Sequence, residues 1–235
     1  MPVFRKNNRI GFYIHIPKTA GSSMTKLLKN IGCEVALDGG NIKQTEKFND
    51  VLKNSNLLKS LHQHSPCNPQ HISKELYRCV VDHSKVNFNF SIVRHPEERL
   101  ISEYFWVNQT YAPEAKYASG ISEYERSKWV KTNDFSEWLR YAKQCYDEDA
   151  YVWDNHLRKQ SEFILSDTKL FRFDQLSKIP DYLNASLGTS FAGLSIPHLN
   201  KKRGGNVTLN IKDEDKELIR NWYKDDYELY HSIKD

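Results

Sequence analysis

The chain has 235 residues, of which 27% are charged and 39% hydrophobic, and its formal net charge is +4. This length suffices for one substantial core, so we expect a single domain over residues 1–235. No apolar run approaches the roughly 20 residues of a membrane span. The mild positive charge suits an anionic ligand, but without a basic stripe it does not indicate a nucleic-acid partner.

The N-terminal segment before Pro17 is basic and then apolar, but its apolar part is too short for the core of a secretory signal. We therefore expect a cytoplasmic protein. Four cysteines, Cys33, Cys67, Cys79 and Cys145, are far apart and form no CxxC pair. This spacing favours reduced thiols over a disulfide framework or a metal site.

Apolar runs alternate with longer helical patterns, which predicts an α/β fold with a parallel sheet. We expect strands at residues 10–16, 33–37, 57–64, 86–94 and 169–173. We expect helices at residues 22–31, 68–80, 95–108, 134–145, 174–188 and about 212–233. Asp134 is a predicted N-cap, because its carboxylate suits the unpaired N–H groups of a first turn. Residues 110–130 show no clear period and are expected to form a long connection on the acceptor side.

The stretch "FYIHIPKTAGSS" (12–23) joins a predicted strand to a predicted helix. The unpaired N–H groups and the dipole of a helix N-terminus favour an anion there. Lys18 supplies a compact positive charge, and Gly21 allows close approach of a ligand. Three hydroxyl groups are also available, on Thr19, Ser22 and Ser23.

This stretch does not have the Walker A pattern GxxxxGK[ST], because Lys18 precedes the only glycine by three residues. The strong strand "FSIV" ends at Arg94 rather than at an acidic residue that could hold magnesium. Both observations disfavour a magnesium–nucleotide site. A polar turn that only caps the helix remains the alternative interpretation.

A second strand-to-helix junction is the segment "SIVRHPEERLISEY" (91–104). Arg94 ends the predicted strand, and Ser102 lies about two turns into the next helix. The guanidinium fork of arginine suits a phosphate, and a serine hydroxyl can add a further hydrogen bond. The alternative is a local ion pair from Arg94 to Glu97 or Glu98.

Two histidines, His62 and His64, alternate in the predicted strand "LLKSLHQH" and therefore point to the same side of it. Histidine is the side chain whose ordinary pKa suits a general base near neutral pH. His15, inside the first predicted strand, is expected to be structural.

Together, these motifs resemble those of the sulfotransferases that use 3′-phosphoadenosine 5′-phosphosulfate (PAPS). The forms "IPKTAGSS", "VRHPEERLISEY" and "PHLNKK" are most similar to the glycan branch that includes heparan sulfate 2-O-sulfotransferase. The resemblance spans Phe12 to about Tyr230. It implies a P-loop-like three-layer sandwich, with a central parallel sheet of about four to five strands flanked by helices and no metal chemistry.

The resemblance also implies roles for individual residues. The 5′-phosphosulfate loop would comprise Lys18, Thr19, Ala20, Gly21, Ser22 and Ser23. Lys18 would stabilise the charge that develops on the departing phosphate. Arg94 and Ser102 would bind the 3′-phosphate. A similar His-x-His in the glycan branch makes His64 the general base and His62 a supporting or substrate-contacting residue.

Two further segments take their roles from the same resemblance. "WDNHLRKQ" (153–160) is similar to a stretch that faces the acceptor, which makes Asn155 and Arg158 candidates for substrate binding. A solvated helix face is the alternative there. "HLNKKRGGN" (198–206) would close over the 3′-phosphate and adenine, or else is a surface loop. Its cationic candidates are Lys201, Lys202 and Arg203.

The predicted function is transfer of the sulfuryl group of PAPS to a hydroxyl of a carbohydrate or small molecule, releasing 3′-phosphoadenosine 5′-phosphate. One alternative is a nucleotide kinase or NTPase, which predicts magnesium-dependent turnover of ATP. The other is a non-catalytic protein that binds an adenosine bisphosphate, which predicts binding without transfer to any acceptor.

Overall fold

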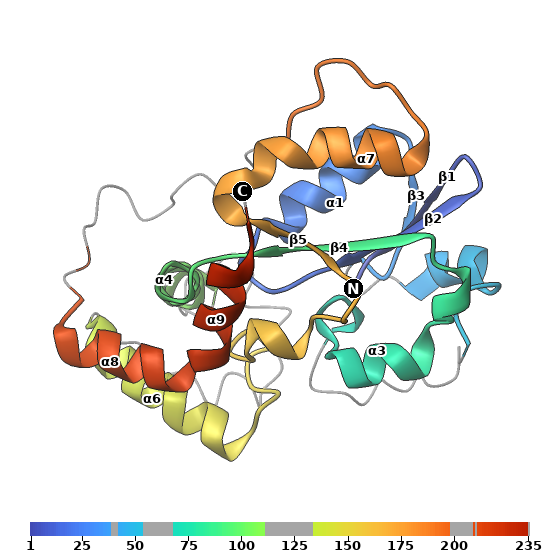
Figure 1. Cartoon of the computed structure of the whole chain (residues 1–235). Helices are drawn as coiled ribbons and strands as arrows, with labels where there is room; N and C mark the ends of the chain where they lie inside the picture. The colour runs from blue at the N-terminus through green and yellow to red at the C-terminus, as the bar shows by residue number, and fades with distance from the viewer. Residues whose placement is uncertain (39–41, 54–67, 111–133, 198–208, 210, 235) are drawn as a thin grey trace.

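The chain folds around one mixed five-stranded sheet, seen here in a computed structural model (Figure 1). The structure describes all residues except 39–41, 54–67, 111–133, 198–208, 210 and 235. Within that part, the strands are β1 (Val3–Lys6), β2 (Arg9–Ile14), β3 (Glu34–Ala36), β4 (Phe88–Val93) and β5 (Lys169–Arg172). Their order in the sheet is β3-β1-β2-β4-β5. The α/β class is confirmed, and the strand expected at residues 57–64 lies outside the described residues.

The sheet is mixed rather than wholly parallel because of an N-terminal hairpin. Strands β2, β4 and β5 run parallel, whereas β1 is antiparallel to both β2 and β3. Asn7 and Asn8 form the turn between β1 and β2, with φ angles of 51° and 58°. Asparagine tolerates this left-handed region, which a two-residue hairpin turn requires. The two asparagines are therefore the sequence signal for a strand that we did not predict.

Helices cover both faces of the sheet (Figure 1). Helices α1 (Gly21–Asn30) and α7 (Ile179–Leu187) lie on one face. Helices α3 (Lys74–Val80) and α9 (Lys224–Ser232) lie on the other face. This arrangement follows from the alternation of side chains along each strand.

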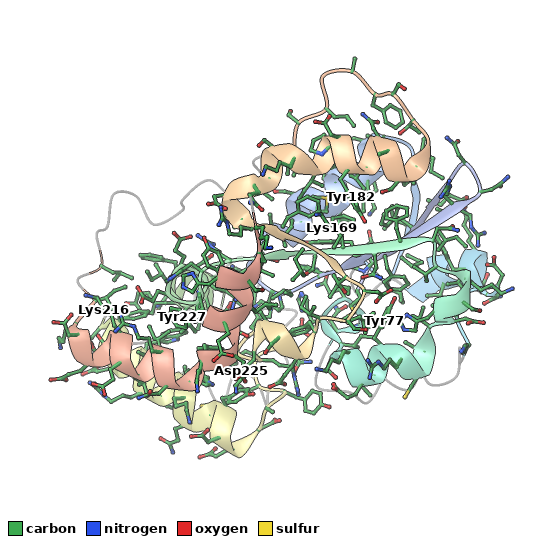
Figure 2. All side chains as sticks on the ribbon, viewed as in Figure 1. Tyr77, Lys169, Tyr182, Lys216, Asp225 and Tyr227 are labelled. Carbon is green, nitrogen blue, oxygen red and sulfur yellow. The ribbon has the colours of Figure 1, made fainter. Side chains whose placement is uncertain are left out.

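Strand β2 shows this alternation directly. Tyr13 belongs to the core that contains α1 and α7, whereas its neighbour Phe12 belongs to the core that contains α3. Figure 2 shows Tyr182 on α7 and Tyr77 on α3, on opposite sides of the sheet. The Tyr77 ring lies 4.5 Å from the Phe12 ring, and the Tyr182 ring lies 5.7 Å from that of Phe90 on β4.

A third core lies beside the sheet, among α4 (Pro96–Thr110), α6 (Phe135–Glu148) and α8 (Asp213–Trp222). Asp134 caps α6 as predicted, and its carboxylate accepts a hydrogen bond from the Glu137 N–H at 2.9 Å. Helix α4 follows β4 directly, so the second predicted junction has the expected strand–helix form.

Three expected helices are divided in the structure. The one expected at 212–233 consists of α8 and α9, which meet at Tyr223. The one expected at 68–80 begins with a 3-10 turn, Pro69–His71, before α3. The one expected at 174–188 likewise begins with the 3-10 segment Phe173–Lys178 before α7.

Candidate active site

A pocket of about 310 Å³ lies where β2 and β4 end. Because these strands are parallel, the loops that follow them meet at the same edge of the sheet. The pocket is lined by His15, Pro17, Lys18, Ala20, Gly21, Ser22, Ser23, Gln70, His71, Arg94, Ser102, Trp106, Asp154, His156, Phe173, Leu176, Ile196 and Pro197. The two predicted anion-binding junctions therefore face one pocket.

The first junction has the backbone of an anion-binding loop. Lys18 and Ala20 have left-handed φ angles of 68° and 70°, and Ala20 is the residue that precedes α1. Left-handed residues ahead of a helix are typical of the concave nests in which backbone N–H groups bind anions. The first turn of α1 contains no acidic residue, so the positive end of the helix dipole is not neutralised locally.

Gly21 is required here by its contact with His15. A Cβ atom on Gly21 would overlap the imidazole ring, so only glycine lets α1 begin so close to β2. The side chain of His15 is buried, and its Nδ1 has no hydrogen-bond partner among the described residues. Burial lowers the pKa of His15 well below its usual value, and the nearby His71 lowers it further. This lowered pKa favours the neutral form of His15, whose ring packs against Gly21 and also lines the pocket.

The three hydroxyl groups of the loop are placed differently. Thr19 is fully buried, and its Oγ1 donates a hydrogen bond to the Ile16 carbonyl at 2.8 Å. Ser22 is exposed and Ser23 is buried, and both line the pocket. Thr19 therefore stabilises the turn, whereas the two serines face the space where a ligand would lie.

At the second junction, Arg94 reaches across to the first. Its Nη1 donates to the Lys18 carbonyl at 3.3 Å, and its guanidinium lies 4.4 Å from the centre of the Phe173 ring. The ion pair with Glu98 that we considered as an alternative is also present, at 3.4 Å. Since the Glu98 side chain is 59% exposed, this pair contributes little to stability, and it leaves Arg94 on the pocket wall together with Ser102.

A buried glutamine fixes the backbone at Arg94. The Gln160 Oε1 accepts from the Arg94 N–H at 3.0 Å, and its Nε2 donates to the Arg94 carbonyl at 2.8 Å. We expect Gln160→Ala to reduce the free energy of unfolding by about 2 kcal/mol, because it leaves two part-buried backbone groups unpaired. Chemical denaturation measures this, with Gln144→Ala on the exposed face of α6 as control. A loss no larger than that of the control would contradict the prediction.

The same pocket is also lined by a histidine with a carboxylate partner. The Nδ1 of His71 lies 2.7 Å from the Oδ2 of Asp154, and the Oδ1 of Asp154 accepts a hydrogen bond from the Asn68 N–H. Burial lowers the pKa of His71, an effect that Asp154 opposes without reversing it. Burial alone would raise the pKa of Asp154, but His71 and His156 hold it below its usual value. An ionised Asp154 accepts the Nδ1–H of a neutral His71, whose Nε2 then keeps its lone pair.

A strained turn presents Asp154 to the pocket. Trp153, Asp154 and Asn155 are consecutive and all left-handed, with φ angles of 50°, 58° and 64°. Such a run is rare for residues other than glycine and persists only where surrounding contacts hold it. The Asn155 amide donates to the His71 carbonyl at 2.8 Å, and Trp153 is buried against Trp138.

A second histidine on this turn has its own carboxylate. The Nδ1 of His156 lies 2.9 Å from the Oε2 of Glu103, and both side chains are buried. Burial alone would raise the pKa of Glu103, but His156, Lys18 and Arg99 together hold it below its usual value. Trp106, one helical turn beyond Glu103 on α4, lies between His156 and the loop. Its ring is 4.5 Å from the His156 ring, and its centre is 5.1 Å from the Lys18 Nζ.

The remaining predicted site residues either lie outside the described part of the chain or do not line the pocket. His62, His64, Lys201, Lys202 and Arg203 lie outside the described residues. Asn155 is fully buried, and its Oδ1 accepts from the Nε of Arg158 at 3.0 Å. Arg158 also pairs with Glu162 at 2.5 Å. In this structure, Asn155 and Arg158 therefore support the turn rather than line the pocket.

Sequence reasoning missed five pocket residues or supports: His71, Asp154, His156, Glu103 and Trp106. His71 was read as part of a helix, although its position just before the helix is one from which a side chain can project. Asp154 and His156 lie in the segment expected to face the acceptor, with a solvated helix face as the alternative, but only Asn155 and Arg158 are predicted there. Neither Asp154 nor His156 has a local signal for a left-handed turn. The Glu103–Trp106 spacing, one helical turn, places both on one face of α4 but does not identify what they face.

The chain has an α/β fold, and its pocket brings Lys18 and Arg94 together with a histidine that has a carboxylate partner. A family model described as "Sulfotransferase family" matches residues 4–231. The chain therefore belongs to the sulfotransferase family, and it is a transferase by that membership. Searches of curated proteins and of solved structures found no match. Among the described residues, no helix is long and apolar enough to cross a membrane.

Proposed function

We propose that this protein transfers the sulfuryl group of PAPS to a hydroxyl of a carbohydrate or small-molecule acceptor. The observation that carries the proposal is that three groups line one pocket: the Lys18 loop, Arg94 with Ser102, and a buried histidine with a half-buried carboxylate partner. A donor with anionic groups at both ends needs two cationic subsites. A hydroxyl acceptor also needs a base within reach.

The chemistry of the lining residues fits PAPS. Lys18, the serines and the loop N–H groups suit the 5′-phosphosulfate, and Arg94 with Ser102 suits the 3′-phosphate. Apolar side chains on the same pocket would face the adenine: Phe173, Leu176, Ile196 and Pro197. When bound, PAPS supplies an activated sulfuryl group with an adenosine bisphosphate as its leaving group. Lys201, Lys202 and Arg203 would add charge over the 3′-phosphate.

Different residues of this chain stabilise the leaving group and accept the acceptor proton. Lys18 stabilises the negative charge that develops on the phosphate as its bond to sulfur breaks. His71 accepts the proton of the acceptor hydroxyl on Nε2 as the new oxygen–sulfur bond forms, while Asp154 holds Nδ1–H. We keep His64, with His62 in support, as the alternative base that the resemblance implies.

The proposal includes further features that the family assignment alone does not specify. We propose membership of the glycan branch similar to heparan sulfate 2-O-sulfotransferase, a P-loop-like three-layer arrangement, a single domain and a cytoplasmic location. Helices on both faces of the parallel strands support the layered arrangement. The reaction itself needs no metal.

Calorimetry tests the donor assignment. We expect adenosine 3′,5′-bisphosphate to bind and ATP with magnesium to bind far more weakly. Arg94→Ala should weaken bisphosphate binding at least tenfold, because a charge-assisted contact to phosphate is lost, a loss of 1.4 kcal/mol or more. Arg140→Ala, an exposed arginine on α6, is the matched control. Tight binding of ATP with magnesium and none of the bisphosphate would contradict the proposal and favour a nucleotide kinase or NTPase.

Transfer of label from ³⁵S-PAPS separates the enzyme from a protein that only binds the donor. We expect labelled product with at least one member of a panel of polyhydroxyl acceptors. Bisphosphate binding without transfer to any acceptor would favour the non-catalytic alternative.

A further inference from the structure

Two histidines and an aspartate in the pocket are arranged like metal ligands. One donor atom from each of His71, Asp154 and His156 lies within 4.8 Å of the donor atoms of the other two. The two imidazole rings are 5.0 Å apart, and both side chains are buried. All three residues line the same pocket, so a fourth ligand position would face open space.

Each imidazole is oriented through Nδ1 by its own carboxylate. Asp154 contacts His71 at 2.7 Å, and Glu103 contacts His156 at 2.9 Å. A carboxylate on the far nitrogen is the usual support of a metal-binding histidine, because it fixes the ring and strengthens the other nitrogen as a donor. Glu103 is such a support for His156 and leaves Nε2 as its ligand atom. Asp154 lies on the Nδ1 side of His71, so it is itself a candidate ligand and would share an ion with that nitrogen.

The backbone holds the two histidines in place before any ion arrives. The left-handed turn at 153–155 is fixed by the Asn155 amide on the His71 carbonyl at 2.8 Å. Arg99 donates to the His156 carbonyl at 2.9 Å and is itself buried. The half-buried Asp154 and the buried Glu103 also supply two negative charges near the point where a dication would lie. The cations near these charges are Lys18 across Trp106, the buried Arg99 beside Glu103, and the N-terminal ammonium near His71.

We propose that His71, Asp154 and His156 bind a divalent cation of the zinc type, and that this cation blocks transfer. Two imidazoles and one carboxylate oxygen suit Zn²⁺ or Co²⁺, whereas Mg²⁺ prefers oxygen ligands alone. Three protein ligands are also the number in zinc sites that keep a fourth position for water or another ligand. An ion bound beside Asp154 takes the Nδ1 position of His71 and leaves the ring proton on Nε2, so Nε2 no longer accepts the acceptor proton. This blocking effect rests on the proposed function, but the binding does not.

The binding test uses the full chain freed of metal with a chelator. Titration with Co²⁺, followed by visible absorption, should show one equivalent bound in a site of low coordination number. His156→Gln and Asp154→Asn should each weaken binding at least tenfold, the scale reported for lost ligands and supports. His231→Ala, an exposed histidine on α9, should bind as wild type does. Equal Co²⁺ binding by wild type, His156→Gln and Asp154→Asn, or no binding at all, would overturn the proposal.

The blocking test is separate. In the labelled-PAPS assay, Zn²⁺ should inhibit the wild-type protein, and a chelator should restore activity. Metal binding with unchanged transfer would refute the blocking role and retain the site. Metal binding by a protein with no transfer activity under any condition would instead refute the proposed function.

Discussion

Replacing Lys18 with alanine is expected to lower turnover about 10²–10³-fold, the scale of one lost electrostatic contact in the transition state. Lys18 is itself left-handed and lies just before α1, and its Nζ is 5.1 Å from the centre of the Trp106 ring. That ring is in turn supported by His156 and Glu103, so the ammonium is held before the donor binds. A preorganised charge acts without reorganising at the moment of reaction.

Single-turnover transfer from labelled PAPS measures this effect, and calorimetry with the bisphosphate measures binding in the same variant. We expect the rate to fall much more than the affinity, because Lys18 acts on charge that appears only as the bond to sulfur breaks. Lys26→Ala, an exposed lysine one turn further along α1, is the control for loss of charge alone. Equal losses in the rates of Lys18→Ala and Lys26→Ala would contradict the role of Lys18.

The parts of the fold that could be predicted are those with strong local patterns. The alternating apolar residues of β4 and the small residues before α1 predicted both strand-to-helix junctions, with boundaries within about two residues of those in the structure. The hairpin of β1 and β2 was missed because its first strand is short and its turn contains asparagine rather than Asn-Gly. That omission also explains why a wholly parallel sheet was expected.

The break between α8 and α9 has a cause that no local pattern contains. The Tyr223 ring is fully buried, and its hydroxyl donates to the Leu157 carbonyl at 2.5 Å. At the start of α9, Asp226 accepts hydrogen bonds from the Gln160 and Ser161 N–H groups. These contacts join segments about 66 residues apart in the sequence. The helical spacing of apolar residues continues through Tyr223 and predicts one helix, whereas the contacts with the distant segment divide it into α8 and α9.

The same limit applies to the candidate site. Lys18, Arg94 and Ser102 were identifiable because each stands at a strand end or in the helix that follows one, and parallel strands bring those positions together. The His71–Asp154 pair joins residues 83 apart through a left-handed turn that no local pattern predicts. The left-handed turn that presents Asp154 depends on the packing of the third core, because Trp153 is part of that core.

Replacing His71 with alanine is expected to lower turnover about 10²–10⁴-fold, the usual contribution of a positioned base. Bisphosphate affinity should change little, because His71 is proposed to face the acceptor rather than the phosphates. Asp154→Asn should give a smaller fall, since the imidazole remains but loses the acceptor that fixes its tautomer. Stopped assays under saturating PAPS measure both variants, and thermal melting checks that each one folds.

The decisive comparison is between His71→Ala and His64→Ala. If His71 is the base, His64→Ala and His62→Ala should retain most of the turnover, or lose it mainly through a higher KM for the acceptor. A normal rate in His71→Ala, together with a large loss of turnover in His64→Ala, would assign the base to the His-x-His pair instead.

Trp106 offers a further check, because Trp106→Ala should disturb Lys18 and His156 but leave the His71–Asp154 pair intact. If Trp106→Ala lost proton transfer to His71 while Lys18 still stabilised the leaving phosphate, these separate roles for Lys18 and His71 would be contradicted.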